Sequence, residues 1–154
     1  MDNTKDYLSK EKYEELEAEL KELKLVARKE VAEHLEYAKS LGDLSENAEY
    51  HEARDKQADI EDRISQIESI LKNAVLIKGH HGATVSLGSK VTVKRADGEL
   101  GEYQVVGSEE ADMQAGKISH QSPIGAALIG HAKGDKVVVT TPRGEVAYSI
   151  LEVK

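Results

Sequence analysis

The stretch 40-SLGDLSENAEYHEARDK-56 lies between two long charged segments, and it decides the fold of the first half of the chain. Gly42 is the only glycine before Gly79, and neither proline comes before position 123, so this half has one evident place to turn. Two helices of similar length joined by a few residues have to fold back antiparallel to bury their apolar sides. We therefore expect the stretch to form the tip of a helical hairpin.

The apolar residues on both sides of this tip follow the spacing of a coiled coil. Steps of three and four residues alternate up to Ala27, and the pattern resumes at Val31 after a slip of register. The predicted seams are Tyr13, Leu16, Leu20, Leu23, Ala27, Val31, Leu35 and Ala38 on one side, and Tyr50, Ala53, Gln57, Ile60, Ile64, Ile67, Leu71 and Ala74 on the other. At 1.5 Å per residue, roughly 30 residues give an arm of about 45 Å. The acidic segment 41–47 would lie at its far end.

The second half of the chain changes to the pattern of strands. The segments SKVTVKR, GEYQVVG, DKVVVTT and EVAYSILEV alternate or are rich in β-branched residues, with ADGE and PRGE as candidate turns between them. Ser122 followed by Pro123 predicts the capped start of one short helix. We therefore predict an α+β chain, with an antiparallel coiled-coil hairpin over residues 1–76 and a small, mostly antiparallel sheet domain with one short helix over residues 77–154.

Composition and charge exclude several classes of protein. The formal net charge is -8, and residues 1–76 contain 12 Lys and Arg against 20 Asp and Glu, so the chain is not expected to coat nucleic acid on its own. The absence of cysteine excludes disulfides, thiolate metal sites and a cysteine nucleophile. No window approaches the ~18 apolar residues of a membrane span, and the N-terminus lacks the apolar core of a signal peptide. We therefore predict a cytoplasmic protein with no membrane partner.

Two acids in the tip, Asp43 and Glu46, have two interpretations. In the structural one, Asp43 is the N-cap of the second helix and Glu46 is the acid of a capping box. In the functional one, both carboxylates converge on Mg²⁺, which prefers oxygen ligands and takes about six of them. The remaining ligands would then come from another protein and a phosphodiester. The length of the arm favours the functional interpretation, because a hairpin that only has to turn does not need about 45 Å.

A resemblance to a known family supports this interpretation. The segment GDLSENAEYHEARDKQ is similar to the signature of the bacterial Gre transcript cleavage factors, and ISHQSPIGAALIG with KGDKVVVTTPRGEVAYSILEV resembles their C-terminal domain. The resemblance covers nearly the whole chain and is greatest to the GreA type. It implies that the coiled coil enters the secondary channel of RNA polymerase and that an FKBP-like C-terminal domain docks at the channel rim. The polymerase would then cleave the 3′ end of backtracked RNA, so the chain would be an elongation factor without catalysis of its own.

The resemblance also implies roles for individual residues. Asp43 and Glu46 would help to hold a Mg²⁺ ion shared with the polymerase, without binding one tightly alone. The further roles are RNA positioning by Lys39 and Arg54, support of the tip by Ser45 and Asn47, and rim contact by Ser122 and Pro123. Gln121 stands where the family often has Asp or Asn, so no role that needs a carboxylate is carried over to it. We expect a monomer whose partners are RNA polymerase and the extruded RNA.

Other interpretations stay open at this point. Some Gre homologues block the polymerase channel without promoting cleavage, although the intact GDLSEN sequence argues against that activity here. A plain coiled-coil interaction module would use both tip acids as caps. Lys39 and Arg54 could be ordinary helix surface, paired with Glu49, Tyr50 or neighbouring acids across a turn. Prolyl isomerase activity is not expected, because Tyr103 and Tyr148 are the only aromatic residues of the second half.

Overall fold

The computed structural model describes residues 4–78 and 82–154, and the chain forms two compact units. One unit is a helical arm, Tyr13–Asn73, and the other joins the N-terminal segment up to Lys12 to the residues from Ala74 onward. The predicted boundary between residues 76 and 77 lies three residues after the boundary of these two units, which falls between Asn73 and Ala74. The segments 6–8 and 74–76, which the sequence pattern placed with the arm, belong to the second unit.

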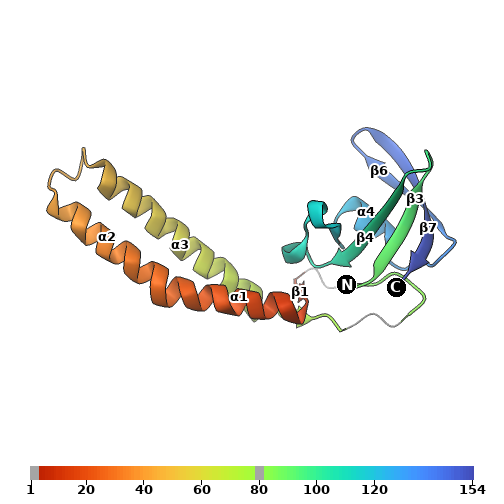
Figure 1. Ribbon diagram of the computed structural model, residues 1–154, viewed down its shortest axis with the longest axis horizontal. Coiled ribbons are helices and arrows are strands. Elements are labelled where there is room, and N and C mark those ends of the chain that lie inside the picture. The colour runs from red at the N-terminus through yellow and green to blue at the C-terminus, as the bar shows by residue number, and fades with distance from the viewer. Residues whose placement is uncertain (1–3, 79–81) are drawn as a thin grey trace. The chain divides into compact units, whose positions relative to one another are not determined.

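The arm is a hairpin of long helical segments (Figure 1). Its elements are α1 (Lys10–Glu22), the π-helix η1 (Leu23–Ala27), α2 (Arg28–Ser40) and α3 (Ala48–Lys72). α2 and α3 lie side by side, run in opposite directions, and bury a cluster of Val31, Ile60 and Ile64. Further buried seam residues are Leu16, Leu35, Ala38, Ala53 and Ile67. The predicted antiparallel hairpin is confirmed.

The π-helix η1 explains the slip of register in the apolar seam. A π-helix has i→i+5 hydrogen bonds, so one turn accommodates an extra residue relative to an α-helix. The slip between Ala27 and Val31 amounts to one residue, and η1 ends at Ala27. Its outer residues Leu25 and Val26 are 62% and 46% exposed. The helix therefore absorbs the slip locally, and the seam continues along α2 without a break.

Ion pairs join the two sides of the hairpin near η1. They include Arg28 with Glu61, Arg63 with Glu19, and Lys24 with Glu68. Arg28 donates two hydrogen bonds of 2.8 Å to the carboxylate of Glu61 and thereby lowers the pKa of that carboxyl. Because these side chains are substantially exposed, each pair contributes little to stability and mainly favours one register between the helices.

Two short parallel strands flank the arm in the sequence. β1 (Asp6–Leu8) pairs with β2 (Ala74–Leu76) in the register Asp6 to Ala74 and Leu8 to Leu76. The prediction that Ala74 continues the helical seam is therefore wrong. α3 ends at Lys72 because the residues from Ala74 exchange backbone hydrogen bonds with β1, a segment distant in the sequence.

Within the described residues, the second unit is built on a five-stranded sheet of order β5-β4-β3-β7-β6. The strands are β3 (Lys90–Arg95), β4 (Leu100–Val106), β5 (Lys117–Ser119), β6 (Lys136–Thr141) and β7 (Gly144–Val153). β4 and β5 are parallel and the other neighbours are antiparallel, so the sheet is mixed. The predicted α+β fold is confirmed, and each of the four predicted strands is present.

One short α-helix packs on this sheet. α4 (Pro123–Leu128) begins as predicted, because the Ser122 Oγ accepts a hydrogen bond of 3.1 Å from the Gly125 N–H and Pro123 occupies the first turn. The core beneath it is aliphatic and consists of Val85, Val91, Val93, Val105, Ile118, Leu128, Val137 and Ile150. Short 3₁₀ turns η2 (Ser108–Glu110) and η3 (Met113–Ala115) connect β4 to β5.

The N-terminal segment is fastened to η2 by polar and backbone contacts. The Ser9 N–H and Oγ donate hydrogen bonds of 2.8 and 2.7 Å to the two carboxylate oxygens of Glu110. The Ser9 Oγ also accepts from the Lys12 N–H at 3.1 Å and so caps α1. Gly107 lies against Tyr7 so closely that a Cβ at this position would be 1.8 Å from the Tyr7 carbonyl oxygen. These contacts hold the N-terminal segment up to Lys12 within the second unit.

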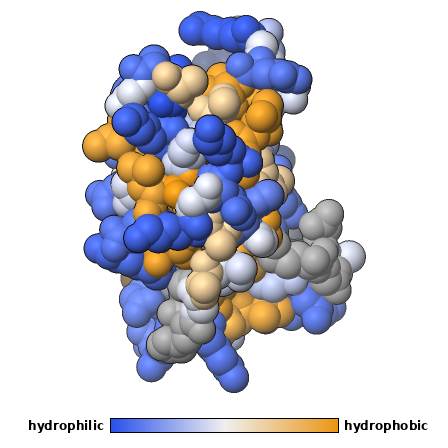
Figure 2. Space-filling view, turned by 90° about the vertical axis from the view of Figure 1, so that its right-hand side faces the viewer, coloured by the Kyte–Doolittle hydropathy of each residue, from blue (hydrophilic) through white to orange (hydrophobic). Residues whose placement is uncertain are grey.

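The surface is mixed in character. Hydrophobic areas, drawn in orange, alternate with hydrophilic areas, drawn in blue, on the face shown in Figure 2. Large exposed apolar side chains of the sheet unit include Leu100, Met113, Val138 and Leu151. Among the residues that the structure describes, no helix is both long and apolar enough to cross a membrane.

Candidate functional site

The tip of the arm turns through two residues in the left-handed backbone region. Gly42 has φ of +76° and Asp43 has φ of +40°. Glycine adopts such values readily, and Asp is among the few other residues that tolerate them. Backbone hydrogen bonds of 3.2 Å from Gly42 N–H to Lys39 O and from Glu46 N–H to Asp43 O close the turn. Asp43 is thus part of a defined turn between α2 and α3.

Asn47 is the residue that caps α3. Its Oδ1 accepts a hydrogen bond of 3.0 Å from the Tyr50 N–H. Its Nδ2 donates to the Ala38 carbonyl oxygen at 2.7 Å and to that of Gly42 at 3.3 Å. One side chain therefore satisfies groups at the N-terminal end of α3 and at the C-terminal end of α2. The support of the tip expected from Asn47 has a direct physical basis in these bonds.

The capping interpretation of Asp43 and Glu46 is wrong. α3 begins at Ala48, so both acids precede the residue that caps it. Both side chains are exposed, and the Ser45 Oγ donates a hydrogen bond of 3.0 Å to Asp43 Oδ1. Among the described residues, Asp43 Oδ2 and the Glu46 carboxylate have no hydrogen-bond partner. The amide of Asn47 takes the capping position because it can bond to both helix ends, which a carboxylate without a donor cannot do.

These two acids are an incomplete ligand set for a metal. The described residues contain no group of three or more His, Cys, Asp or Glu side chains placed to hold a metal ion. Asp43 and Glu46 can offer two hard oxygen ligands, whereas Mg²⁺ takes about six in octahedral geometry. Their exposure leaves them accessible to ligands from another molecule.

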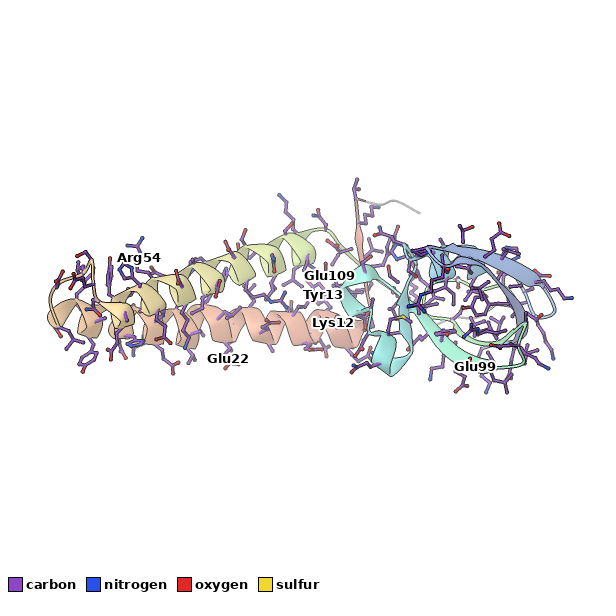
Figure 3. The ribbon with its side chains drawn as sticks, turned by 90° about the horizontal axis from the view of Figure 1, so that it is seen from above. Lys12, Tyr13, Glu22, Arg54, Glu99 and Glu109 are labelled. Atoms are coloured by element: carbon purple, nitrogen blue, oxygen red, sulfur yellow. The ribbon has the colours of Figure 1, made fainter. Side chains whose placement is uncertain are left out.

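Basic and aromatic side chains lie close to the acidic turn. Arg54 lies on α3 near the tip (Figure 3), where its Nη1 donates a hydrogen bond of 3.0 Å to the Tyr50 hydroxyl. Its guanidinium carbon is 5.9 Å from the centroid of the Tyr50 ring. The His51 Nε2 lies 3.4 Å from the Ser45 carbonyl oxygen, so His51 contacts the turn. Lys39 is exposed in the last turn of α2.

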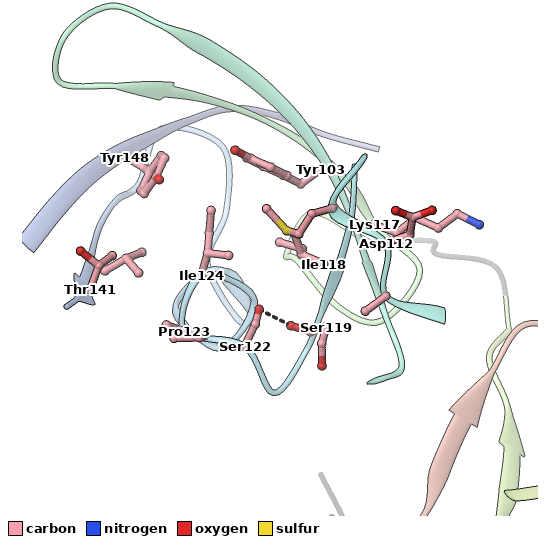
Figure 4. A pocket seen from close by; sticks show the side chains of 13 residues that line it. Tyr103, Asp112, Lys117, Ile118, Ser119, Ser122, Pro123, Ile124, Thr141 and Tyr148 are labelled. Carbon is pink, nitrogen blue, oxygen red and sulfur yellow. Dashed lines mark hydrogen bonds between the residues drawn. The ribbon is translucent and has the colours of Figure 1, made fainter. Parts of the chain in front are cut away.

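A second feature lies in the sheet unit, where a pocket of about 420 Å³ opens beside α4 (Figure 4). Its lining is largely apolar and consists of Tyr103, Ala111, Asp112, Met113, Lys117, Ile118, Ser119, Ser122, Pro123, Ile124, Val139, Thr141 and Tyr148. Ser122 donates a hydrogen bond of 2.6 Å to the Ser119 carbonyl oxygen, and this bond holds the start of α4 against β5. Ser122 and Pro123, the residues predicted to contact a partner, thus form part of a pocket wall.

Several polar side chains in and near the pocket wall form hydrogen bonds within the chain. Burial raises the pKa of the Tyr103 hydroxyl, whose ring lines the pocket. The Gln121 Oε1 accepts a hydrogen bond of 3.0 Å from the Ser108 Oγ, so Gln121 ties the loop before α4 to η2. No sequence pattern indicated the pocket, because its lining comes from strands and turns that are far apart in the sequence. The exposed Met113, 68% accessible, is the one lining residue whose apolar character in a polar segment could have drawn attention.

Comparisons with known proteins place the chain among transcription factors. Residues 6–76 match the family model "Transcription elongation factor, N-terminal", and residues 80–154 match "Transcription elongation factor, GreA/GreB, C-term". Transcription elongation factor GreA of Bacillus cytotoxicus is 48% identical over 150 residues, covering 96% of this chain and 95% of the relative. GreA of Geobacillus kaustophilus is also 48% identical, with complete coverage of both chains.

A solved structure is similar over the same length. The crystal structure of GreA factor homolog 1 of Thermus thermophilus has 31% sequence identity and covers 97% of this chain and 99% of its own, with a TM-score of 0.46. That TM-score is too low to support an argument about geometry, whereas the sequence matches are extensive and cover both units. On this evidence, the chain belongs to the GreA/GreB family of transcription elongation factors.

Proposed function

We propose that this chain is a transcript cleavage factor of the GreA type, which stimulates RNA polymerase to cleave the 3′ end of backtracked RNA. Membership of the family supports the polymerase as partner. The observation that carries the proposal is the cap of α3 by Asn47. Because Asn47 performs the capping, Asp43 and Glu46 have no task in starting the helix. Two exposed carboxylates at the end of a long hairpin are then available for chemistry in a partner's active centre.

The dimensions of the hairpin suit delivery of these acids to a buried centre. α3 has 25 residues, which correspond to roughly 37 Å of helix. Two helices side by side are about 20 Å across, so the arm fits a channel of that width. We propose that the secondary channel of the polymerase receives it, as the family resemblance implies.

Mg²⁺ fits the acids as part of a shared ligand set. The Ser45 hydroxyl bonds to one oxygen of Asp43 and leaves the other available, and Glu46 follows within the same turn. The polymerase and the RNA phosphodiester would have to complete the coordination. When bound, the ion would supply activation of the attacking water and stabilisation of charge on the phosphodiester. Asp43 and Glu46 would serve as oxygen ligands and water-orienting groups, and this chain would perform no cleavage alone.

Positive charge is needed beside these acids, because the RNA end brings phosphates to the tip and phosphate contacts position it. We assign this role to Lys39 and Arg54, which lie on α2 and α3 respectively. The hydrogen-bond partner of Arg54 is the Tyr50 hydroxyl and not a carboxylate, so this contact leaves the guanidinium available to an anion.

The pocket beside α4 is the surface that we propose for docking at the channel rim. Ser122 and Pro123 lie in its wall, and its largely apolar lining suits an apolar side chain of the polymerase. This contact would supply binding energy while the tip supplies chemistry. A monomer acting in the cytoplasm is the state that we expect for the factor.

The test uses halted, backtracked elongation complexes with labelled RNA in the presence of Mg²⁺. The wild type should release short 3′ fragments rapidly. Asp43→Asn and Glu46→Gln should slow this release by about 10² to 10³-fold, as expected for loss of a preorganised electrostatic group, while binding to the polymerase persists. The matched controls are Asp59→Asn and Glu36→Gln, which neutralise exposed acids elsewhere on the arm and should cleave like the wild type.

The outcomes separate the competing functions. A wild type that binds the polymerase and suppresses cleavage would establish an inhibitor instead. If the tip variants cleave as fast as the two controls, the acids have no chemical role and the proposed function of the tip is refuted.

A further inference from the structure

Arginines on the arm differ in what holds their guanidinium groups. Arg28 donates two hydrogen bonds to Glu61, and both bonds are 2.8 Å long. Arg63 donates two hydrogen bonds to Glu19, of 2.7 and 3.0 Å. In both cases a carboxylate engages the guanidinium fork and neutralises its charge. These two arginines are therefore unavailable to an incoming phosphate.

Arg54 is held in a different way, by an uncharged partner. Its Nη1 donates to the Tyr50 hydroxyl at 3.0 Å, and its guanidinium carbon lies 5.9 Å from the ring centroid, within the range of a cation–π contact. Among the described residues, no carboxylate forms an ion pair with Arg54. Its side chain is exposed, and only one of its nitrogens is engaged. The contact restricts the side chain while its charge and most of its donors stay available.

Tyr50 is itself anchored to the acidic turn. Its backbone N–H is bound by Asn47, the residue that also bonds to the end of α2. Its ring packs edge-on against His51 with the centroids 5.7 Å apart. His51 in turn contacts the Ser45 carbonyl oxygen at 3.4 Å. Arg54 is therefore connected, through Tyr50, to the same turn that carries the acids.

We propose that Tyr50 is a positioning residue, which holds the Arg54 guanidinium ready to bind a phosphodiester of the RNA end. Arg54 would make the contact, and Tyr50 would act through it. The physical advantage is entropic, because a long arginine side chain that is already restricted loses less rotamer freedom when it binds. A carboxylate in place of Tyr50 would hold Arg54 equally well but would cancel the charge that attracts the phosphate. This inference rests on the proposed function.

The test is a double-mutant cycle in the cleavage assay with backtracked complexes. Tyr50→Phe removes the hydroxyl and keeps the ring, and it should lower the maximal rate of stimulated cleavage by about threefold to tenfold. The factor concentration that gives half-maximal stimulation should change by less than about twofold, since docking by the sheet unit is untouched. Introduced together with Arg54→Ala, the same Tyr50→Phe change should have no further effect. Thermal melting of each variant checks that the arm remains folded.

Tyr37 supplies the matched control. It is 58% exposed on α2, and among the described residues its hydroxyl has no partner. Tyr37→Phe should therefore cleave like the wild type. The inference is overturned if Tyr50→Phe is without effect while Arg54→Ala slows cleavage, or if Tyr50→Phe slows cleavage equally with and without Arg54. A wild type that does not stimulate cleavage at all would overturn the proposed function and this inference together, so the two failures are distinguishable.

Discussion

Replacement of Asn47 tests whether one side chain closes the tip of the arm. Asn47→Ala removes the cap on the Tyr50 N–H, which is worth ~1 kcal/mol in a typical helix. It also removes the 2.7 Å hydrogen bond to the Ala38 carbonyl oxygen, which contributes ~1 kcal/mol. We therefore expect the local stability of the tip to fall by about 2 kcal/mol.

Amide hydrogen exchange of Tyr50 is the suitable measurement, because a helix end can open without unfolding of the whole arm. A loss of about 2 kcal/mol corresponds to exchange roughly 30-fold faster. Asn47→Ser keeps an oxygen for the cap and loses the donor to Ala38, so its exchange should be about fivefold faster. Asn73→Ala, at the C-cap of α3, is the control and should leave the Tyr50 amide unchanged.

Variants of the two tip acids show whether Asn47 alone caps α3. Asp43→Asn and Glu46→Gln should leave the exchange of the Tyr50 amide within about twofold of the wild type, because neither acid caps α3. If either acid variant accelerates exchange as much as Asn47→Ala, or if Asn47→Ala has no effect, our account of the tip is wrong.

Three further predictions concern the sheet unit. Glu110→Ala should lower the free energy of unfolding in urea by about 1 to 2 kcal/mol, because it leaves the Ser9 N–H without its acceptor, whereas Glu109→Ala on the exposed neighbour should cost under ~0.5 kcal/mol. Gly107→Ala should cost about 3 kcal/mol or more, because its Cβ would lie 1.8 Å from the Tyr7 carbonyl oxygen, whereas Gly134→Ala, in open space with φ of +93°, should cost ~1 kcal/mol; equal costs would contradict the steric argument. The hydrogen bond from the Ala132 N–H lowers the pKa of the Asp135 carboxyl, so its stabilisation is present above the unfolded pKa of about 4 and is lost as the pH falls through the folded pKa. Carboxyl NMR titration checks this, and titration of Asp135 at or above the unfolded value would refute it.

Several elements followed from local sequence patterns. The 3,4 spacing specified the hairpin, and even the one-residue slip after Ala27 corresponds to a physical feature, the π-helix η1. Ser122 and Pro123 marked the start of α4 because capping and a preset φ act within one turn of the chain. The alternating segments predicted strands because successive side chains of a single strand point to opposite faces of the sheet, which is again a local property.

The tip shows where local reasoning reached its limit. The pattern Asp43-x-x-Glu46 matches a capping box, yet Asn47 is the cap. The choice depends on the Ala38 carbonyl oxygen, which lies nine residues earlier and comes within 2.7 Å of Asn47 only after the hairpin has closed. The family signature identified Asp43 and Glu46 as candidate functional residues, but only the folded turn shows that neither of them caps α3.

By itself, then, the sequence determined the periodic elements, the hairpin, and the residue types available at its tip. The tertiary structure alone decided the contacts between distant segments, which are β1 with β2, Ser9 with Glu110, and the lining of the pocket beside α4. It also decided that Arg54 bonds to the Tyr50 hydroxyl. The physical reason is that the periodic patterns depend on interactions between residues that are close in the sequence. These contacts instead depend on which backbone and side-chain groups the complete fold brings within hydrogen-bond distance.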